Sequence, residues 1–337
     1  MRPAFVLLIL TAILAVSVAV SLATGSGGWG AERILLDLRL MRTACAGLAG
    51  AALAVAGVMV QGLFRNPLAS PDVIGTTAGA TLGGQLALVA HAALVGVLPL
   101  WLAPELVLPL GCLIGAAAAL SVLLAAAGRG GGGGGGIVAV LLTGFVITAM
   151  VGALSGLLTS LAAGRWELAR ALTGFGMGGV DGKGIGHIAL AVPLVLAGIG
   201  AAWAWGRTCD LLLAGEEEAA ALGVDTGRAR RWLLAWTALL AAAAVAVGGA
   251  LSFVGLIVPH ALRPFTGVEH RRLVPAAALG GAALLILCDV VARAVPLGAT
   301  WFGIPGPGEL PLGVVTGLIG GPVFLMLLIR ARREGTL

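Results

Sequence analysis

The sequence predicts an all-α integral membrane protein, a polytopic bundle of about ten transmembrane helices per subunit. Hydrophobic residues make up 59% of the 337 residues and charged residues only 10%, with a mean hydropathy of +1.08. A water-exposed surface needs far more charge than this. Apolar runs of about 20 residues, the length that crosses a hydrocarbon core of about 30 Å as a helix, recur along the chain. We therefore expect residues 1–337 to form a single transmembrane domain.

The predicted spans follow the apolar runs. The first run is long and has no clean small-residue cleavage site before Trp29, so we interpret it as a span and not as a signal peptide. A short apolar piece at 253–264 is interrupted by Pro259 and His260, which favours a broken or half-length helix at membrane depth. The nine full spans are expected near 4–24, 43–63, 75–97, 105–127, 137–160, 188–206, 232–250, 273–294 and 311–330.

The basic residues predict the orientation. With the N-terminus inside, 13 of the 20 Lys and Arg residues fall in cytoplasmic segments and seven fall outside. Because cytoplasmic segments carry the excess of positive charge, both termini are expected in the cytoplasm. The net charge of +5 is thus a feature of topology. The basic residues are too dispersed along the chain for nucleic-acid binding.

Glycines recur at four-residue spacing. Gly75, Gly79 and Gly83 form one such stripe, and pairs occur at Gly111/Gly115 and Gly152/Gly156. In lipid, small residues at this spacing let two helix backbones approach closely. We expect tight packing within the bundle, and an interface that slides during transport is the alternative. Another stripe comprises Gly313, Gly317 and Gly321.

Motifs for catalysis and cofactor binding are missing from the sequence. The run Gly130 to Gly136 is followed by Ile137 and Val138, where a P-loop needs Lys and Ser or Thr. The sequence contains neither a nucleophile elbow nor a His-Glu-x-x-His motif. We therefore expect no enzyme activity, no cofactor and no metal site, and energy must come from another subunit or an ion. The isolated cysteines, expected to be structural, are Cys45, Cys112, Cys209 and Cys288.

Few polar groups lie within the spans. Gln61, Gln85, His91 and Asp289 are the main ones, and Asp289 can pair with Arg293 one helical turn later. Ion-driven carriers need relays of intramembrane carboxylates. A secondary transporter is therefore the less favoured class.

One charged insert interrupts this apolar chain. It contains Gly215, Glu216 and Gly223 and lies between two spans, so it must face water and a partner.

Several further motifs occur in a fixed order, and together they resemble the FecCD family of ABC importer permeases over about residues 35–330. They are Arg39-Leu40-Met41-Arg42, Gly50 to Gly57, Gln61, Arg65 to Pro71, Gly79-Ala80, Gly215-Glu216, Leu222-Gly223-Val224, Phe253 to His260, Arg263, Glu269-His270-Arg271, Asp289, Arg293, Glu309 to Gly313 and Gly320 to Phe324.

The resemblance implies a cobalamin-permease-like subunit of the inner membrane. It implies a homodimer, two cytoplasmic ABC ATPase subunits and a periplasmic or lipid-anchored substrate-binding protein, all in membrane lipid. The cargo expected from it is an iron chelate, either a siderophore or haem. Cobalamin is the alternative, because the ending Gly178-Gly179-Val180-Asp181 is similar to that of cobalamin permeases. The sequence departs from the family at Met41, which replaces a usual proline, in the glycine run, and in the long stretch 296–308.

The resemblance also implies roles for individual residues. Arg39, Arg42 and Arg293 would pair with acidic residues of the binding protein, because a guanidinium grips a carboxylate with two hydrogen bonds. Anchoring of helix ends at lipid headgroups is their alternative role. The segment 211–226 would be the coupling helix, and the glycine run would hold the cytoplasmic gate unless it is a plain flexible loop. The coupling residues are Gly215, Glu216, Ala219, Leu222 and Gly223, and the gate residues are Gly135 and Gly136.

Overall fold

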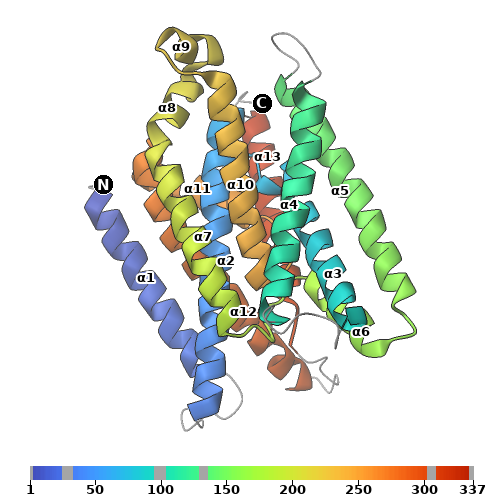
Figure 1. Ribbon diagram of the computed structural model, residues 1–337. Helices are drawn as coiled ribbons and strands as arrows, with labels where there is room; N and C mark the ends of the chain where they lie inside the picture. The colour runs from blue at the N-terminus through green and yellow to red at the C-terminus, as the bar shows by residue number, and fades with distance from the viewer. Residues whose placement is uncertain (1–2, 25–32, 95–103, 129–135, 302–308, 334–337) are drawn as a thin grey trace.

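The computed structural model describes residues 3–24, 33–94, 104–128, 136–301 and 309–333, and over these residues the protein is helical without strands. Long helices run roughly parallel and antiparallel to one another in a single bundle (Figure 1). The elements are α1 (Pro3–Ala23), α2 (Arg33–Phe64), the 3₁₀ turn η2 (Pro71–Ile74), α3 (Thr76–Leu94), α4 (Pro104–Gly128), α5 (Gly136–Leu161), α6 (Trp166–Gly176), α7 (Ile185–Ala204), α8 (Gly206–Ala214), α9 (Glu216–Ala221), α10 (Thr226–Gly248), α11 (Val254–Thr266), α12 (His270–Trp301) and α13 (Leu312–Arg333).

Each of the ten predicted membrane segments corresponds to a helix of the structure. Within the described residues, eight helices are long and apolar enough to cross a membrane. The predicted span near 75–97 corresponds to α3, which has 19 residues, carries Gln85 and His91 and is not among these eight. The tenth, the predicted half-length helix, is the 13-residue α11 with Pro259 and Pro264 inside it.

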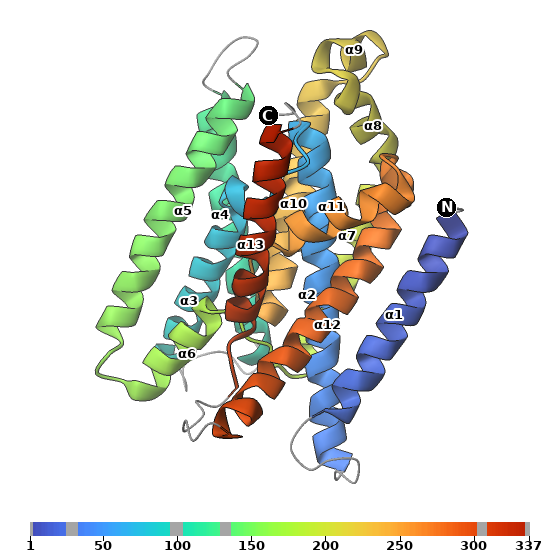
Figure 2. The ribbon, with the colours of Figure 1, turned by 180° about the vertical axis from the view of Figure 1, so that it is seen from behind.

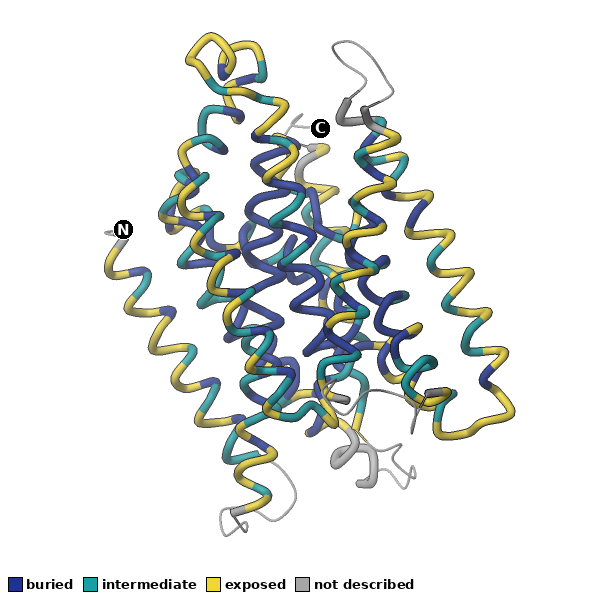
Figure 3. The backbone as a smooth tube through the Cα atoms, in the orientation of Figure 1, coloured by how far each residue is buried: buried dark blue, intermediate teal, exposed yellow. Residues whose placement is uncertain are grey.

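The centre of the bundle is formed by α2 and α10. Most of their residues are buried, whereas α1, α5 and α13 on the periphery expose many apolar side chains (Figure 3). Close backbone approach explains part of this packing. A Cβ atom on Gly50 of α2 would collide with the carbonyl group of Gly281 on α12, so the contact requires glycine on this helix face.

The glycine stripes divide into packed and open ones. A Cβ atom on Gly79 would lie 2.6 Å from the carbonyl oxygen of Gly115, and Gly83 meets Gly111 in the same way, so α3 and α4 pack as predicted. The prediction of tight packing within the bundle is wrong for the open ones, because spacing alone does not say what covers a helix face. No atom of the described chain lies within 4 Å of such a Cβ position at Gly152, Gly156, Gly317 or Gly321.

The two ends of the bundle carry different short helices. Helices α8 and α9 extend from one end, which we call the α9 end, and α6 lies across the opposite end, which we call the α6 end (Figures 1 and 2). The C-terminal part of α13 lies toward the α9 end. The charged insert thus lies at the opposite end of the bundle from α6.

Candidate functional site

A cluster of ionised side chains lies at the α6 end. The Arg42 guanidinium on α2 lies 2.5 Å from Asp181 Oδ1 and 2.8 Å from Asp289 Oδ1, and it also pairs with Glu309. Asp181 precedes α7, Asp289 lies on α12 and Glu309 precedes α13. One side chain thus connects four segments that are far apart in the sequence, and we call these residues with Arg293 the Arg42 cluster.

The buried member of the Arg42 cluster is Asp289. Its side chain has no exposed surface, and it pairs with Arg293 at 3.1 Å as well as with Arg42. Arg293 also donates to the carbonyl oxygens of Ser21 and Thr24, at 3.2 and 2.6 Å. The predicted pair of Asp289 with Arg293 is confirmed. A buried charge is costly unless it is paired and hydrogen-bonded, and two guanidinium groups meet that requirement here.

The three arginines expected to bind a partner lie at the same end but point largely into their own subunit. Arg39 is buried and donates to the carbonyl oxygen of Leu22 at 2.9 Å. Arg42 and Arg293 hold Asp289, so both are also mostly buried. The most exposed charges of the cluster are carboxylates, with the side chains of Asp181 and Glu309 exposed by 64% and 47%. Both residues occur in the quoted motifs, but the sequence does not show that they pair with Arg42.

At the α9 end, the charged insert folds as predicted into a short helix between two glycines. Gly215 has φ 141° before α9 and Gly223 has φ 86° after it, a conformation that favours glycine. Glu216 pairs with Arg230 at 2.5 Å, which attaches α9 to α10. The side chain of Leu222 is exposed by 67% and extends away from the bundle's own core.

The role expected for Ala219 needs correction. Ala219 is fully buried, because this face of α9 packs on the subunit's own core. Ala219 therefore packs α9 against the rest of the subunit and has no surface exposed for a partner. Leu222, in contrast to Ala219, has an exposed apolar side chain that a partner can contact.

A second connection at this end was not predicted. Asp210 on α8 accepts hydrogen bonds from the backbone N–H of His270 at 3.0 Å and from its ring Nδ1 at 2.6 Å. The neighbouring Arg271 lies over the ring of Trp203, 4.7 Å from its centroid. Helix α8, which leads into α9, is thus attached to the first turn of α12. Sixty residues separate Asp210 from His270, and no sequence motif links them.

The predicted gate is described only in part. Gly135 lies outside the described residues, and Gly136 is the first residue of α5, near the α9 end (Figure 1). Among the residues that the structure describes, no group of three or more His, Cys, Asp or Glu side chains is arranged to hold a metal ion. The four cysteines are free and buried.

Together, the long apolar helices of this bundle define a multi-pass membrane protein. The model of the FecCD transport family matches residues 4–330, and the chain belongs to this family of ABC transporter permeases. Over 304 residues it is 37% identical to the hemin transport system permease protein HmuU of Yersinia pestis, covering 89% of this chain and 84% of that protein. It is 36% identical to the Fe(3+) dicitrate transport system permease protein FecD of Escherichia coli, covering 89% and 86%.

Two further similarities bear on the fold and the cargo. The chain is 38% identical to the cobalamin import system permease protein BtuC of Halobacterium salinarum, covering 88% of this chain and 74% of that protein. A solved chain provisionally described as a metal-chelate type ABC transporter, in an inward-facing conformation, matches with a TM-score of 0.82. That chain has 27% identity, and the match covers 97% of this chain and 99% of the other.

Proposed function

We propose that this protein is the permease subunit of an ABC importer that carries an iron chelate, siderophore or haem, across the inner membrane. The energy comes from ATP hydrolysed by a separate subunit, since the sequence has no P-loop lysine followed by Ser or Thr. The observation that carries the proposal is α9, a short helix fixed between Gly215 and Gly223, with Leu222 exposed at its end. This geometry fits a helix that docks into an ATPase.

The α9 end is the cytoplasmic end in this proposal. Arg228, Arg230 and Arg231 begin α10 at this end, and Arg330 lies near the end of α13. Cytoplasmic segments carry such an excess of arginine and lysine. The N-terminus and the C-terminus then both face the cytoplasm, and α6 faces the periplasm.

Two copies of the subunit form the pathway. The open glycine faces of α5 and α13 support this step, because a Cβ atom at Gly152, Gly156, Gly317 or Gly321 would have no packing neighbour within 4 Å in the described chain. Small residues on a lipid-facing helix surface favour helix association. A homodimer would cover these faces.

The binding protein docks at the α6 end through Arg39, Arg42 and Arg293. In the described state Arg42 is already paired with Asp181 and Glu309, the two exposed carboxylates of the cluster. An acidic side chain of the binding protein would replace one of these intrachain carboxylates. Docking is therefore an exchange of ion-pair partners, and a carboxylate released from Arg42 becomes free to move with its own segment.

The cargo assignment favours an iron chelate because HmuU and FecD carry hemin and ferric dicitrate according to their names. Cobalamin is the second candidate, supported by the similarity to cobalamin permeases. The test is uptake into proteoliposomes that contain the permease, its ATPase subunits and the binding protein. We expect ATP-driven uptake of a radioiron chelate that an uncoupler does not change. Uptake that collapses with the uncoupler at constant ATP would instead indicate a secondary transporter.

A further inference from the structure

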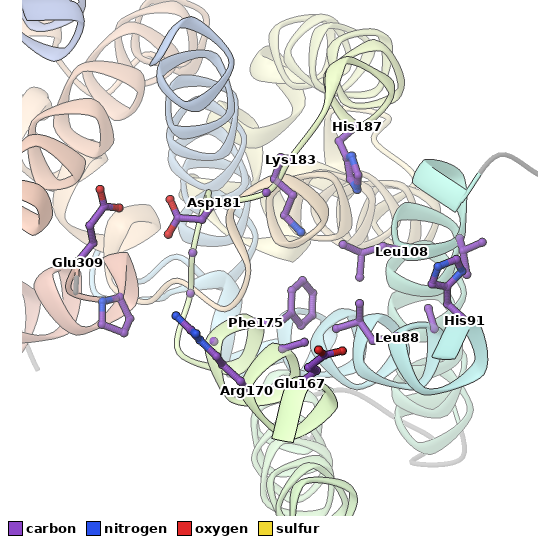
Figure 4. Close-up of a pocket in the computed structure, with 18 of the residues that line it drawn as sticks. Leu88, His91, Leu108, Glu167, Arg170, Phe175, Asp181, Lys183, His187 and Glu309 are labelled. Carbon is purple, nitrogen blue, oxygen red and sulfur yellow. The ribbon is translucent and has the colours of Figure 1, made fainter. Parts of the chain in front are cut away.

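A cavity of about 790 Å³ lies beneath α6, separate from the open glycine faces. Side chains from α3, α4, α6 and the connection before α7 line it (Figure 4). Its volume is in the range of sites that hold small molecules, which is about 300–1,000 Å³. No residue role assigned so far accounts for it.

Two of the acidic residues at its rim share one arginine. Asp181 and Glu309 line the cavity, and both pair with Arg42. Lys183 and Arg170 also line it, and within the described residues neither lies in an ion pair. Glu167, one turn before Arg170 on α6, is the remaining acidic residue of the lining. Lys183 and Arg170 are therefore the cations of the described lining that no ion pair holds.

Lys183 is the central group. Its ammonium lies 5.2 Å from the centroid of the Phe175 ring, and Figure 4 shows both side chains facing the cavity. Burial lowers the pKa of Lys183 to about 8, because the charged form loses hydration. A bound anion would stabilise the charged ammonium and so compensate for the hydration that it loses on burial.

A second polar group in the cavity has one atom without a hydrogen-bond partner. The His187 ring is more than nine-tenths buried, lines the cavity and has no hydrogen-bond partner for its Nδ1 atom. Buried polar atoms without a partner are rare in proteins. Leu88 and Leu108 add apolar surface to the lining, as labelled in Figure 4. The lining combines cations, carboxylates, an imidazole with an unpartnered Nδ1 atom and apolar surface.

We propose that this cavity is a reception site for an anionic, carboxylate-bearing metal chelate, with Lys183 and Arg170 as its recognition residues. The proposal rests on the importer function and specifies its cargo class. A carboxylate of the chelate would pair with the Lys183 ammonium, while the apolar part would lie against Leu88 and Leu108. Each subunit would then hold the chelate at the periplasmic end before it enters the pathway between subunits.

The experiment measures binding of ferric dicitrate and hemin to the full permease in nanodiscs, without binding protein. Lys183→Met should weaken binding of both probes at least tenfold, and Lys183→Arg should retain it within threefold. Arg165→Gln is the control, because Arg165 precedes the same helix but does not line the cavity. Cobalamin, whose side chains are amides, should bind at least tenfold more weakly than ferric dicitrate.

Lys183 is the only lysine of the chain, which provides a second readout. Ferric dicitrate should slow acylation of Lys183 at pH 9 and leave the N-terminal amine unaffected.

Unchanged affinity in Lys183→Met, equal binding of cobalamin, or absence of binding to the wild-type permease would overturn the reception site. If the complete transporter still takes up ferric dicitrate with ATP, the importer function stands without the site. Absence of ATP-driven uptake of every chelate tested would instead contradict the importer function itself.

Discussion

Asp210 on α8 holds His270 at the start of α12 by two hydrogen bonds, at 3.0 Å to the backbone N–H and 2.6 Å to ring Nδ1. Helix α12 continues from there to Asp289 and Arg293 in the Arg42 cluster. One continuous helix thus joins the segment that carries α9 to the ion pairs near α6. A displacement of α9 therefore has a direct structural route to the opposite end.

Asp210→Asn should reduce the coupling between these ends. The neutral amide holds His270 less strongly, so stimulation of ATPase activity by the binding protein should fall at least fivefold while the subunits still assemble. Glu269→Gln is the matched control, because Glu269 forms only an exposed pair with Arg272, and such pairs contribute about 0–1 kcal/mol. Equal stimulation in the two variants would show that the Asp210–His270 contact is only structural.

The same contact predicts a pH dependence. Burial alone would raise the pKa of Asp210, but the hydrogen bonds from His270 outweigh burial and lower the pKa below 3.8. A carboxylate with a lowered pKa stabilises the fold above its unfolded-state pKa and loses that contribution as the pH falls through the folded-state value. The difference in unfolding temperature between wild type and Asp210→Asn should therefore persist from pH 8 to 5 and shrink only below about pH 4. A difference that vanishes near pH 6 would contradict this assignment.

Arg42→Gln should destabilise the subunit. Removing one partner of a buried ion pair costs about 3–5 kcal/mol, and the loss should lie near the lower value because Arg293 still pairs with Asp289. Arg272→Gln makes the same chemical change at an exposed pair and should cost less than about 1 kcal/mol. Thermal unfolding in nanodiscs checks both variants. Equal unfolding temperatures would mean that the Arg42 cluster contributes little to the fold.

Two glycine substitutions should separate subunit folding from dimer formation. Gly50→Val places side-chain atoms against the backbone of Gly281 and should lower the unfolding temperature of the subunit strongly. A Cβ atom at Gly152 has no packing neighbour within 4 Å in the described chain, so Gly152→Leu should leave subunit unfolding unchanged while weakening the dimer. Unfolding in nanodiscs and cross-linking between subunits measure the two effects. A dimer unaffected by Gly152→Leu would place the interface elsewhere.

The sequence predicts helices well and contacts between distant residues poorly. Spans and the half-length helix with Pro259 follow from apolar length and proline position, and the φ of Gly223 follows from the requirements of a helix end. Identical glycine spacing, however, gave a packed face at Gly79 and an open one at Gly152. Likewise, no local pattern assigns Asp181 to Arg42, because that pairing depends on how four segments meet in three dimensions.

The contact surface of α9 provides the most direct test of the proposed function. Leu222→Asp places a charge in the apolar contact with the ATPase, which is unfavourable because the charge would be buried without a partner. Leu222→Met keeps the apolar surface and is the matched control. The measurement is ATP hydrolysis by the reconstituted transporter with and without loaded binding protein. We expect Leu222→Asp to abolish the stimulation or the assembly with the ATPase while binding-protein docking persists. Leu222→Met should behave as wild type. Normal stimulation and assembly in Leu222→Asp would contradict the role of α9 as the coupling helix.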